Sequence, residues 1–249
     1  MSKTAFISEL FSSVQGEGLF AGRRQIFLRL MECNLDCRYC DTDFALSPGG
    51  KCETAPGSGV YRDFPQPVTL PVITSLMNEW VTRLPGAHHS ISLTGGEPLV
   101  SVDTLIEWLP ELGRLLPVHL ETNGTLHRAL QQVKPLVRHI SMDIKLPSTS
   151  GIDRSLWEEH ALFLREAYGT SLAVKIVVSG LTTPEEVRQV ADVISAVDAA
   201  IPLFIQPLSL PDGSVGIGAG ALLLLQELVS TRLSDVRVIP QMHRMLGAL

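Results

Sequence analysis

The feature that most limits how this chain can fold is a regular alternation of helix-like and strand-like segments from Val72 to Ile239. Strands that alternate with helices predict a parallel sheet with right-handed crossovers, and in such folds the chemistry gathers at the carboxyl ends of the strands. Hydrophobic period distinguishes the two kinds of segment. The predicted strands are 90–93, 118–120, 137–142, 172–178, 203–206 and 236–239, and the predicted helices are 72–84, 102–116, 126–133, 153–168, 184–197 and 219–230.

The segment before this alternation is less regular. Residues 6–18 read as a short strand that runs into a polar loop, in which Gln15 and Glu17 alternate with glycines. A turn explains the glycines, and so does a ligand site, since glycine lets a backbone approach a ligand closely. Gln25–Leu30 is predicted to be the strand that leads into the cysteines. Arg29 within it is either an edge residue or a bidentate partner for a carboxylate.

Three of the four cysteines lie within eight residues, at Cys33, Cys37 and Cys40. Gaps of three and two residues allow the sulfurs of one short loop to hold three corners of an iron–sulfur cube, which leaves one iron open for a substrate or cofactor. Spacing alone leaves two other uses open. Cys52 would complete a four-cysteine zinc site with the triplet, and paired cysteines would form disulfides in a secreted protein.

The amino terminus and the composition bear on the cellular compartment and the partners of the protein. The chain begins with no signal-peptide pattern, and no apolar run approaches the ~20 residues of a membrane helix. We therefore expect a cytoplasmic protein, in which clustered cysteines usually mean metal binding or catalysis. The net charge of −6 gives no general attraction for nucleic acid. We expect neither nucleic acid nor a membrane as a partner.

Residues 44–71 differ from the rest of the chain because they are rich in proline and glycine and lack periodicity. This composition predicts a loop or lid insertion that follows the cysteine loop. Cys52 lies inside it, and a mobile position of that kind is poorly suited to a fourth metal ligand. We expect a single domain over residues 1–249 that carries this insertion.

A second motif, Thr94-Gly95-Gly96-Glu97-Pro98, follows the predicted strand 90–93. Together with the cysteine loop it resembles the two signatures of the radical S-adenosylmethionine (SAM) superfamily, and zinc becomes the weaker alternative. The resemblance implies a partial (β/α)6 TIM-like barrel. It also implies a [4Fe-4S] cluster whose open iron binds SAM and whose reduced form generates a 5′-deoxyadenosyl radical. Backbone groups at the glycines and the Glu97 carboxylate are expected to meet the methionine end of SAM.

Within this superfamily the chain resembles the 7-carboxy-7-deazaguanine synthase family over nearly its whole length. The implied reaction, in queuosine and deazapurine biosynthesis, contracts the ring of 6-carboxy-5,6,7,8-tetrahydropterin to 7-carboxy-7-deazaguanine and releases ammonia. Mg²⁺ is an implied cofactor. The motifs that carry this resemblance are 12–18, Arg29, Cys40-Asp41-Thr42, 121–124, 141–147, Gln206-Pro207 and 240–244.

The resemblance also assigns residues to three groups. The cluster is expected on Cys33, Cys37 and Cys40, and Mg²⁺, which prefers oxygen ligands, on the Thr42 hydroxyl. The substrate is expected to contact Val14, Gln15, Gly16, Glu17, Arg29, Thr94, His243 and Leu249, with Glu17 and Arg29 as catalytic residues and Glu17 as a candidate base for ammonia loss. SAM is expected to contact Arg38, Tyr39, Gly95, Gly96, Glu97, Glu121, Asp143, Ile144, Lys145, Gln206, Pro207, Leu208 and Ser209.

The expected partners are the carboxypterin substrate, a flavodoxin-like electron donor and a second copy of the chain in a homodimer. Two alternatives stay open. A radical SAM activase that places a glycyl radical on a partner protein would share the cysteine and Gly-Gly-Glu motifs, but it would not need the 15–18 loop, Arg29 or Thr42. A non-catalytic cluster or zinc protein that acts as a redox sensor would need only the cysteines.

Overall fold

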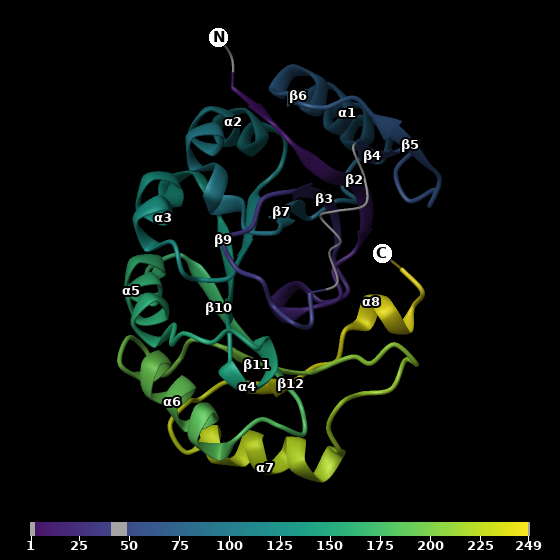
Figure 1. Ribbon diagram of the computed structural model, residues 1–249. Helices are drawn as coiled ribbons and strands as arrows, with labels where there is room; N and C mark the ends of the chain where they lie inside the picture. Colours follow the sequence, from purple (N-terminus) through teal and green to yellow (C-terminus); the bar gives the residue numbers. More distant parts are fainter. Residues whose placement is uncertain (1–2, 41–48, 249) are drawn as a thin grey trace.

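The computed structural model describes residues 3–40 and 49–248. Its main element is a ten-stranded sheet with the order β12-β11-β10-β9-β8-β7-β3-β2-β4-β5 (Figure 1). Seven neighbouring strands of this sheet run parallel, as the alternation of strands and helices predicts. They are β3 (Arg24–Leu30), β7 (Ser90–Gly95), β8 (Val118–Thr122), β9 (His139–Ile144), β10 (Ser171–Val178), β11 (Leu203–Pro207) and β12 (Val236–Val238).

The helices form an arc around the outside of this sheet, from α1 beside the amino-terminal strands to α7 at the opposite end (Figure 1). The two outermost strands, β12 and β5, each pair with one neighbour, so the described sheet is an open barrel and confirms the predicted fold class. The long helices are α1 (Leu70–Arg83), α2 (Val102–Leu115), α3 (His127–Val133), α5 (Trp157–Ala167), α6 (Pro184–Ser195) and α7 (Ala219–Ser230), and the short ones are η1 (Gly18–Phe20), η2 (Pro98–Ser101), η3 (Lys134–Leu136), α4 (Pro147–Ser150) and α8 (Met242–Met245).

Helix α6 illustrates how local sequence sets these elements. Thr183 and Glu186 form a reciprocal capping box, and Pro184 occupies the first turn, where its missing N–H costs no hydrogen bond. One stripe of the helix is buried against the sheet. It consists of Val187, Val190, Ala191 and Ile194. Helix α5 begins at Trp157, later than the predicted start at residue 153.

The predicted loop or lid over 44–71 contains regular secondary structure in its described part. Strands β4 (Gly50–Glu53) and β5 (Tyr61–Phe64) extend the main sheet beyond β2 (Ile7–Val14), and β6 (Val68–Thr69) pairs with β1 (Thr4–Ala5). These strands are too short to show a clear period of two in the sequence.

Cys52 lies in β4 and is fully buried in the hydrophobic core, so the expectation of a mobile position was wrong. The next residue, Glu53, holds the following loop with its buried carboxylate. It accepts hydrogen bonds from the backbone N–H groups of Ser12, Gly57 and Gly59 at 2.7 to 2.9 Å. A buried carboxylate with several donors fixes a loop that composition alone would leave free.

Most of the buried apolar side chains of the described residues form one hydrophobic cluster, to which both the sheet and the surrounding helices contribute. One contiguous core is the usual arrangement within a domain. The single-domain organisation over residues 1–249 stays a prediction. Within the described part of the chain, none of the helices combines the length and apolar character that would let it span a bilayer.

We predict that Cys52→Ala leaves the iron content of the protein unchanged but lowers its free energy of unfolding by about 1 kcal/mol, because the variant removes a packed core thiol and no ligand. Iron analysis and thermal unfolding of the anaerobically prepared variant test this. Cys37→Ala is the matched control and is expected to lose the iron. Loss of iron from Cys52→Ala would contradict the placement of Cys52 in the core.

Candidate active site

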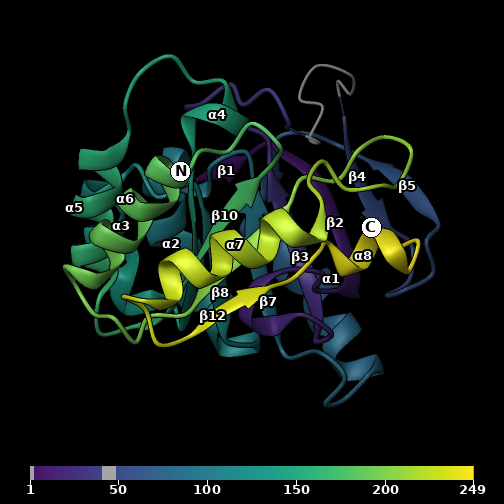
Figure 2. The same ribbon diagram turned by 90° about the horizontal axis from the view of Figure 1, so that it is seen from below.

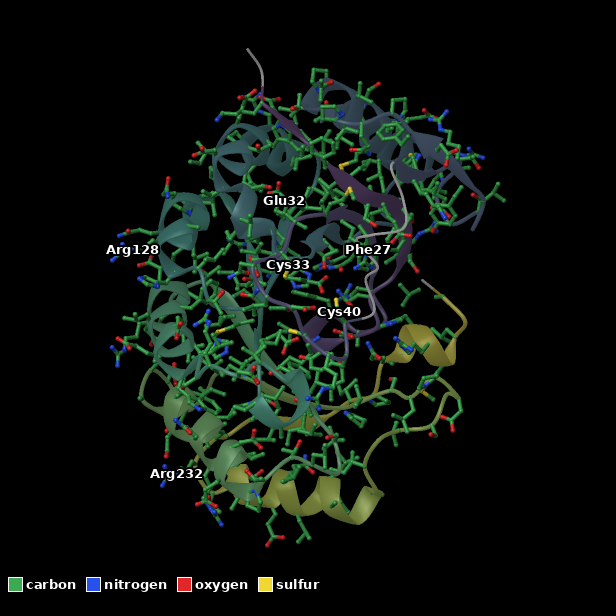
Figure 3. All side chains as sticks on the ribbon, viewed as in Figure 1. Phe27, Glu32, Cys33, Cys40, Arg128 and Arg232 are labelled. Atoms are coloured by element: carbon green, nitrogen blue, oxygen red, sulfur yellow. The ribbon has the colours of Figure 1, made fainter. Side chains whose placement is uncertain are left out.

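A cavity of about 240 Å³ opens at the carboxyl ends of the parallel strands. Its wall is built from the ends of β3 and β7 to β11, from the cysteine loop after β3, and from the 15–18 loop after β2. Cys33 and Cys40 lie near the middle of the molecule, whereas Arg128 and Arg232 mark the outer surface of the helical layer (Figure 3). The position agrees with the general rule that sites in parallel α/β folds form at this edge of the sheet.

The three cysteines of the loop all line this cavity as reduced thiols. The loop is held by a turn in which Cys40 N donates to Cys37 O at 3.0 Å, and by Arg38 N, which donates to Ser150 O at 2.8 Å. Burial raises the pKa of Cys33, and it raises the pKa of Cys37 to about 11. Thiolates in this loop therefore need a cation to stabilise them, which a bound iron cluster provides.

No three His, Cys, Asp or Glu side chains in the described segments are arranged to hold one metal ion. A cube does not require such an arrangement, because each of its three cysteines binds a different iron. The chemistry of the donor set and its position on the cavity wall fit a cluster with one open iron.

The glycines of the second motif allow it to pack directly on the cysteine loop. Gly95 has φ +128°, and a Cβ there would collide with the backbone of Leu30. A Cβ on Gly96 would lie 2.7 Å from Cys33 Cβ and would also collide with the carbonyl of Glu32. The sequence therefore needs glycine at both positions for contact between the two motifs, in addition to any contact with a ligand.

Glu97 has a structural role that the sequence did not predict. Its carboxylate is fully buried and accepts from Leu99 N at 3.0 Å, from Thr122 Oγ1 at 2.9 Å and from Asn123 N at 2.6 Å. Glu97 is not among the residues that line the cavity, and its expected contact with the ammonium of SAM stays a prediction. Burial raises the pKa of Glu97 to about 7 despite these donors. The side chain fixes the 121–124 loop; Asn123 Nδ2 in turn donates to Asn34 Oδ1 at 2.8 Å.

Glu17 is held by three side chains from distant parts of the chain. Its Oε2 pairs with Lys175 Nζ, and its Oε1 accepts from Gln206 Nε2 at 3.0 Å and Gln241 Nε2 at 2.7 Å. Burial raises the pKa of Glu17, but the charge of Lys175 and these hydrogen bonds outweigh it and lower the pKa to about 2. A carboxylate of that pKa is a weak base at neutral pH. The structure thus favours Glu17 as an anionic hydrogen-bond acceptor over the predicted role of a base.

Lys175 also joins this carboxylate to the other side of the cavity. Its Nζ lies 3.3 Å from Asp143 Oδ2, which is 2.8 Å from Lys145 Nζ. Lys145 Nζ in turn lies 3.1 Å from the Tyr39 hydroxyl oxygen. Burial opposes both ammonium charges, but the neighbouring carboxylates keep the pKa of Lys175 and that of Lys145 above the usual value. Asp143 Oδ1 is buried and makes no hydrogen bond to any residue that the structure describes.

Arg29 lies on β3 and reaches the cavity wall. Its Nε donates to Glu9 Oε2 at 3.1 Å, and its guanidinium carbon lies 5.9 Å from the ring centre of Phe11. Phe11 stacks on Phe27 with the ring centres 4.9 Å apart. This arrangement fixes the guanidinium through Nε alone. Its two terminal nitrogens form no hydrogen bond with the described residues, which leaves them able to bind a carboxylate.

The carboxy-terminal segment crosses back from β12 to the amino-terminal strands (Figure 2). Met242 N donates to Gly16 O at 2.9 Å, and a Cβ on Gly16 would lie 2.6 Å from His243 N. His243 lines the cavity as predicted from the resemblance, although the sequence alone gave no indication that the tail reaches this far.

Most of the predicted contact residues meet at this one cavity. Arg38 is exposed and packs beside Gly151, and Ile144 points into the core, since neighbouring strand residues face opposite sides; neither lines the cavity. Thr42 and Leu249 lie outside the described residues. The residues that do line it are Val14, Gln15, Gly16, Glu17, Arg29, Tyr39, Thr94, Gly95, Gly96, Glu121, Asp143, Lys145, Gln206, Pro207, Leu208, Ser209 and His243.

Sequence reasoning missed three residues that organise the site, namely Lys175, Gln241 and His160. Lys175 is the one charged residue in the apolar strand 171–178, which is a usable signal for an inward-facing functional group. His160 is buried on α5; its Nδ1 lies 3.0 Å from Gly124 O and its Nε2 accepts from Lys145 N at 3.1 Å. It therefore ties two cavity loops together, and the helical pattern gives no hint of this.

Comparison with known proteins agrees with this geometry. The model of the radical SAM superfamily matches residues 31–194. A 7-carboxy-7-deazaguanine synthase of Geobacter sulfurreducens is 45% identical over all of both chains. One of Methanothermobacter thermautotrophicus is 36% identical over 97% of this chain and 96% of its own. Among solved structures, QueE from Escherichia coli has the same fold, with a TM-score of 0.58, 19% identity, and coverage of 96% of this chain and 95% of that chain.

We predict that Lys175→Met lowers the free energy of unfolding at pH 7 by about 3 to 5 kcal/mol, because it leaves two buried carboxylates without their shared cation. In the wild type the pKa of Glu17 is depressed, so its stabilisation is complete above about pH 4.5 and is lost as the pH falls towards 2. Without Lys175, burial of the uncompensated carboxylate raises the pKa of Glu17, so the stability deficit of the variant should shrink as the pH falls and protonation removes the buried charge. Urea unfolding as a function of pH tests this.

The control is Lys51→Met, which removes an exposed lysine of β4 and should change the unfolding free energy little. If the two variants have the same stability and the same pH profile, the bridge between Glu17 and Asp143 contributes nothing.

Proposed function

Because the chain belongs to the radical SAM superfamily and, within it, to the 7-carboxy-7-deazaguanine synthase family, we propose that it contracts 6-carboxy-5,6,7,8-tetrahydropterin to 7-carboxy-7-deazaguanine with loss of ammonia, a step of queuosine biosynthesis. The observation that carries the proposal is the single cavity in which the cysteine loop, the Gly95-Gly96 turn and the 15–18 loop meet. This supports the proposal, because it would bring the cluster, SAM and the substrate together in one cavity.

As a radical SAM enzyme the chain uses a [4Fe-4S] cluster and SAM, and Cys33, Cys37 and Cys40 are the residues that would hold the cluster. When bound, these groups supply a 5′-deoxyadenosyl radical that removes a hydrogen atom from the substrate. The task of the protein is to hold the reacting C–H bond in place and to exclude water and other hydrogen donors.

The cofactor side of the cavity is the wall around Asp143, Lys145 and Tyr39, together with residues 206–209. The two lysines hold Asp143 through Oδ2 only, so its buried Oδ1 is available to accept from an N–H or O–H group of SAM. A buried acceptor without a partner is costly, and a ligand donor would remove that cost. His160 keeps the Lys145 backbone in position for this contact.

The substrate side is the wall formed by the 15–17 loop, Arg29 and Thr94. We assign the terminal nitrogens of Arg29 to the substrate carboxylate, because a guanidinium binds a carboxylate through two parallel hydrogen bonds. Glu17 stays ionised and offers its remaining lone pairs to N–H groups of the pterin ring. His243, carried by the carboxy-terminal segment, closes this side.

Several further features belong to the proposal. Thr42 is assigned to Mg²⁺ through its hydroxyl oxygen, which would position substrate oxygens and neutralise charge. A flavodoxin-like protein is the proposed electron donor, and the chain is proposed to be a single domain that works in the cytoplasm as a homodimer.

Family membership argues against the two alternative functions, a glycyl radical activase and a redox sensor. Neither would need the 15–18 loop or Arg29 in the cavity wall.

We predict that anaerobically reconstituted protein, incubated with SAM, dithionite, Mg²⁺ and the carboxypterin, forms 7-carboxy-7-deazaguanine, which mass spectrometry detects, and ammonia.

Arg29→Gln should raise the KM for the carboxypterin about 10-fold to 100-fold because it removes the charge opposite the carboxylate. SAM cleavage without any deazaguanine would reject the proposed substrate, and absence of SAM cleavage would reject the reaction class.

We also predict that Thr42→Ala weakens the dependence of turnover on Mg²⁺ while the iron content is retained, because the variant removes one oxygen ligand and no cysteine. Thr42→Ser keeps the hydroxyl and should respond to Mg²⁺ like the wild type. A Mg²⁺ titration of turnover for the three proteins tests this. The same response in Thr42→Ala as in the wild type would remove Thr42 from the metal site.

A further inference from the structure

A continuous set of hydrogen bonds runs beneath the substrate side of the cavity, from the 15–17 loop to strand β9. The Glu17 backbone N–H donates to Gln15 Oε1 at 3.0 Å. Gln15 Nε2 then lies 3.1 Å from Gln25 Oε1, and Gln25 Nε2 lies 3.2 Å from His119 Nδ1. The last contact in the set joins His119 Nε2 to Ser141 Oγ at 2.8 Å.

The first contact fixes the direction of all the others. A backbone N–H can only donate, so the oxygen of the Gln15 amide faces Glu17 and its nitrogen donates to Gln25 Oε1 and, at 2.9 Å, to Glu121 Oε1. The Gln25 amide is then also fixed, because its other orientation would bring two NH₂ groups together. Its nitrogen donates to His119 Nδ1 and, at 2.7 Å, to Ser90 Oγ.

These donors settle the tautomer of His119. Its Nδ1 accepts from Gln25, so in the neutral ring the proton sits on Nε2 and is donated to Ser141 Oγ. Burial, with the charge of His89, lowers the pKa of His119 to about 3, which keeps the ring neutral at physiological pH. Ser141 Oγ is therefore an acceptor toward His119, and its own proton must point elsewhere.

The cavity is the space left for that proton. Ser141 is a half-buried lining residue whose neighbour on β10 is Ala173, and its hydroxyl makes no second hydrogen bond to any residue within the described ranges. A Cβ built on Gly18 would lie 3.8 Å from Ser141 Oγ, which places this hydroxyl next to the loop assigned to the substrate. A hydroxyl with an unused proton thus lines the same cavity as Glu17, a carboxylate whose position is fixed by Gln206 and Gln241.

We propose that the Ser141 hydroxyl is a specificity-determining residue that donates a hydrogen bond to an acceptor on the substrate ring, a carbonyl oxygen or an unprotonated ring nitrogen. The inference deepens the proposed function and rests on it. Ser141 would donate to an acceptor on one flat heterocycle, and Glu17 would accept from N–H groups of the same ring. A ring that presents a C–H group toward Ser141 would leave the hydroxyl proton without an acceptor and would bind less tightly.

The test is anaerobic calorimetric titration of the cluster-loaded protein with 6-carboxy-5,6,7,8-tetrahydropterin, without reductant, and separately with SAM. Ser141→Ala should weaken pterin binding about tenfold, as expected for a lost hydrogen bond in a desolvated site. Affinity for SAM should stay within twofold of the wild-type value. Ser141→Cys keeps the size but donates weakly, and it should give an intermediate loss. Ser230→Ala, an exposed serine at the end of α7, is the matched control.

In turnover, Ser141→Ala should raise the KM for the pterin with little change in kcat, because the hydroxyl binds the ring and does not touch the reacting bond. Equal pterin affinities of the wild type and Ser141→Ala would overturn the inference and leave the proposed function standing. A similar loss of pterin and SAM affinity together with a lower Tm would also overturn it, since it would show a merely structural role. Failure of the wild type to bind the pterin would reject the proposed function itself.

Discussion

The site depends on buried charges that pair with one another in the cavity wall. Lys175, from β10, pairs with Glu17 of the amino-terminal loop and with Asp143 of β9, and Asp143 also pairs with Lys145. Each charge would be costly to bury alone, but together they are mutually satisfied and their positions are fixed. The network therefore links the amino-terminal loop to the ends of β9 and β10, the two sides proposed for the substrate and for SAM, while Asp143 Oδ1 makes no hydrogen bond to a described residue.

A second constraint joins the two signature motifs. Because Gly95 and Gly96 lack side chains, the end of β7 can lie against the cysteine loop, and Glu97 extends the contact to the 121–124 loop. Three segments that are far apart in the sequence thus form one wall. The cysteine loop and the Gly95-Gly96 motif occur together for a steric reason. A larger residue at either glycine would push the cysteine loop away from the cavity.

The sequence predicts the parallel strands and most helices because their hydrophobic periods are long and regular. It also indicates where the site forms, since the polar motifs follow the strands. It fails for β4 and β5, which are short and lie in a segment rich in proline and glycine; they are strands because β4 pairs with β2 and β5 pairs with β4. The roles of Glu97, His160 and Lys175 were equally hidden, because each depends on partners more than ten residues away that only the folded chain brings near.

The most direct test of the account concerns the position of the substrate in the cavity. The proposed function requires the C6–H bond of the carboxypterin to lie against the 5′ carbon of the adenosyl group. With substrate deuterated at C6, the account predicts that deuterium appears in the 5′-deoxyadenosyl group recovered after turnover. Recovery of that group without deuterium, while deazaguanine is formed, would contradict the proposed arrangement.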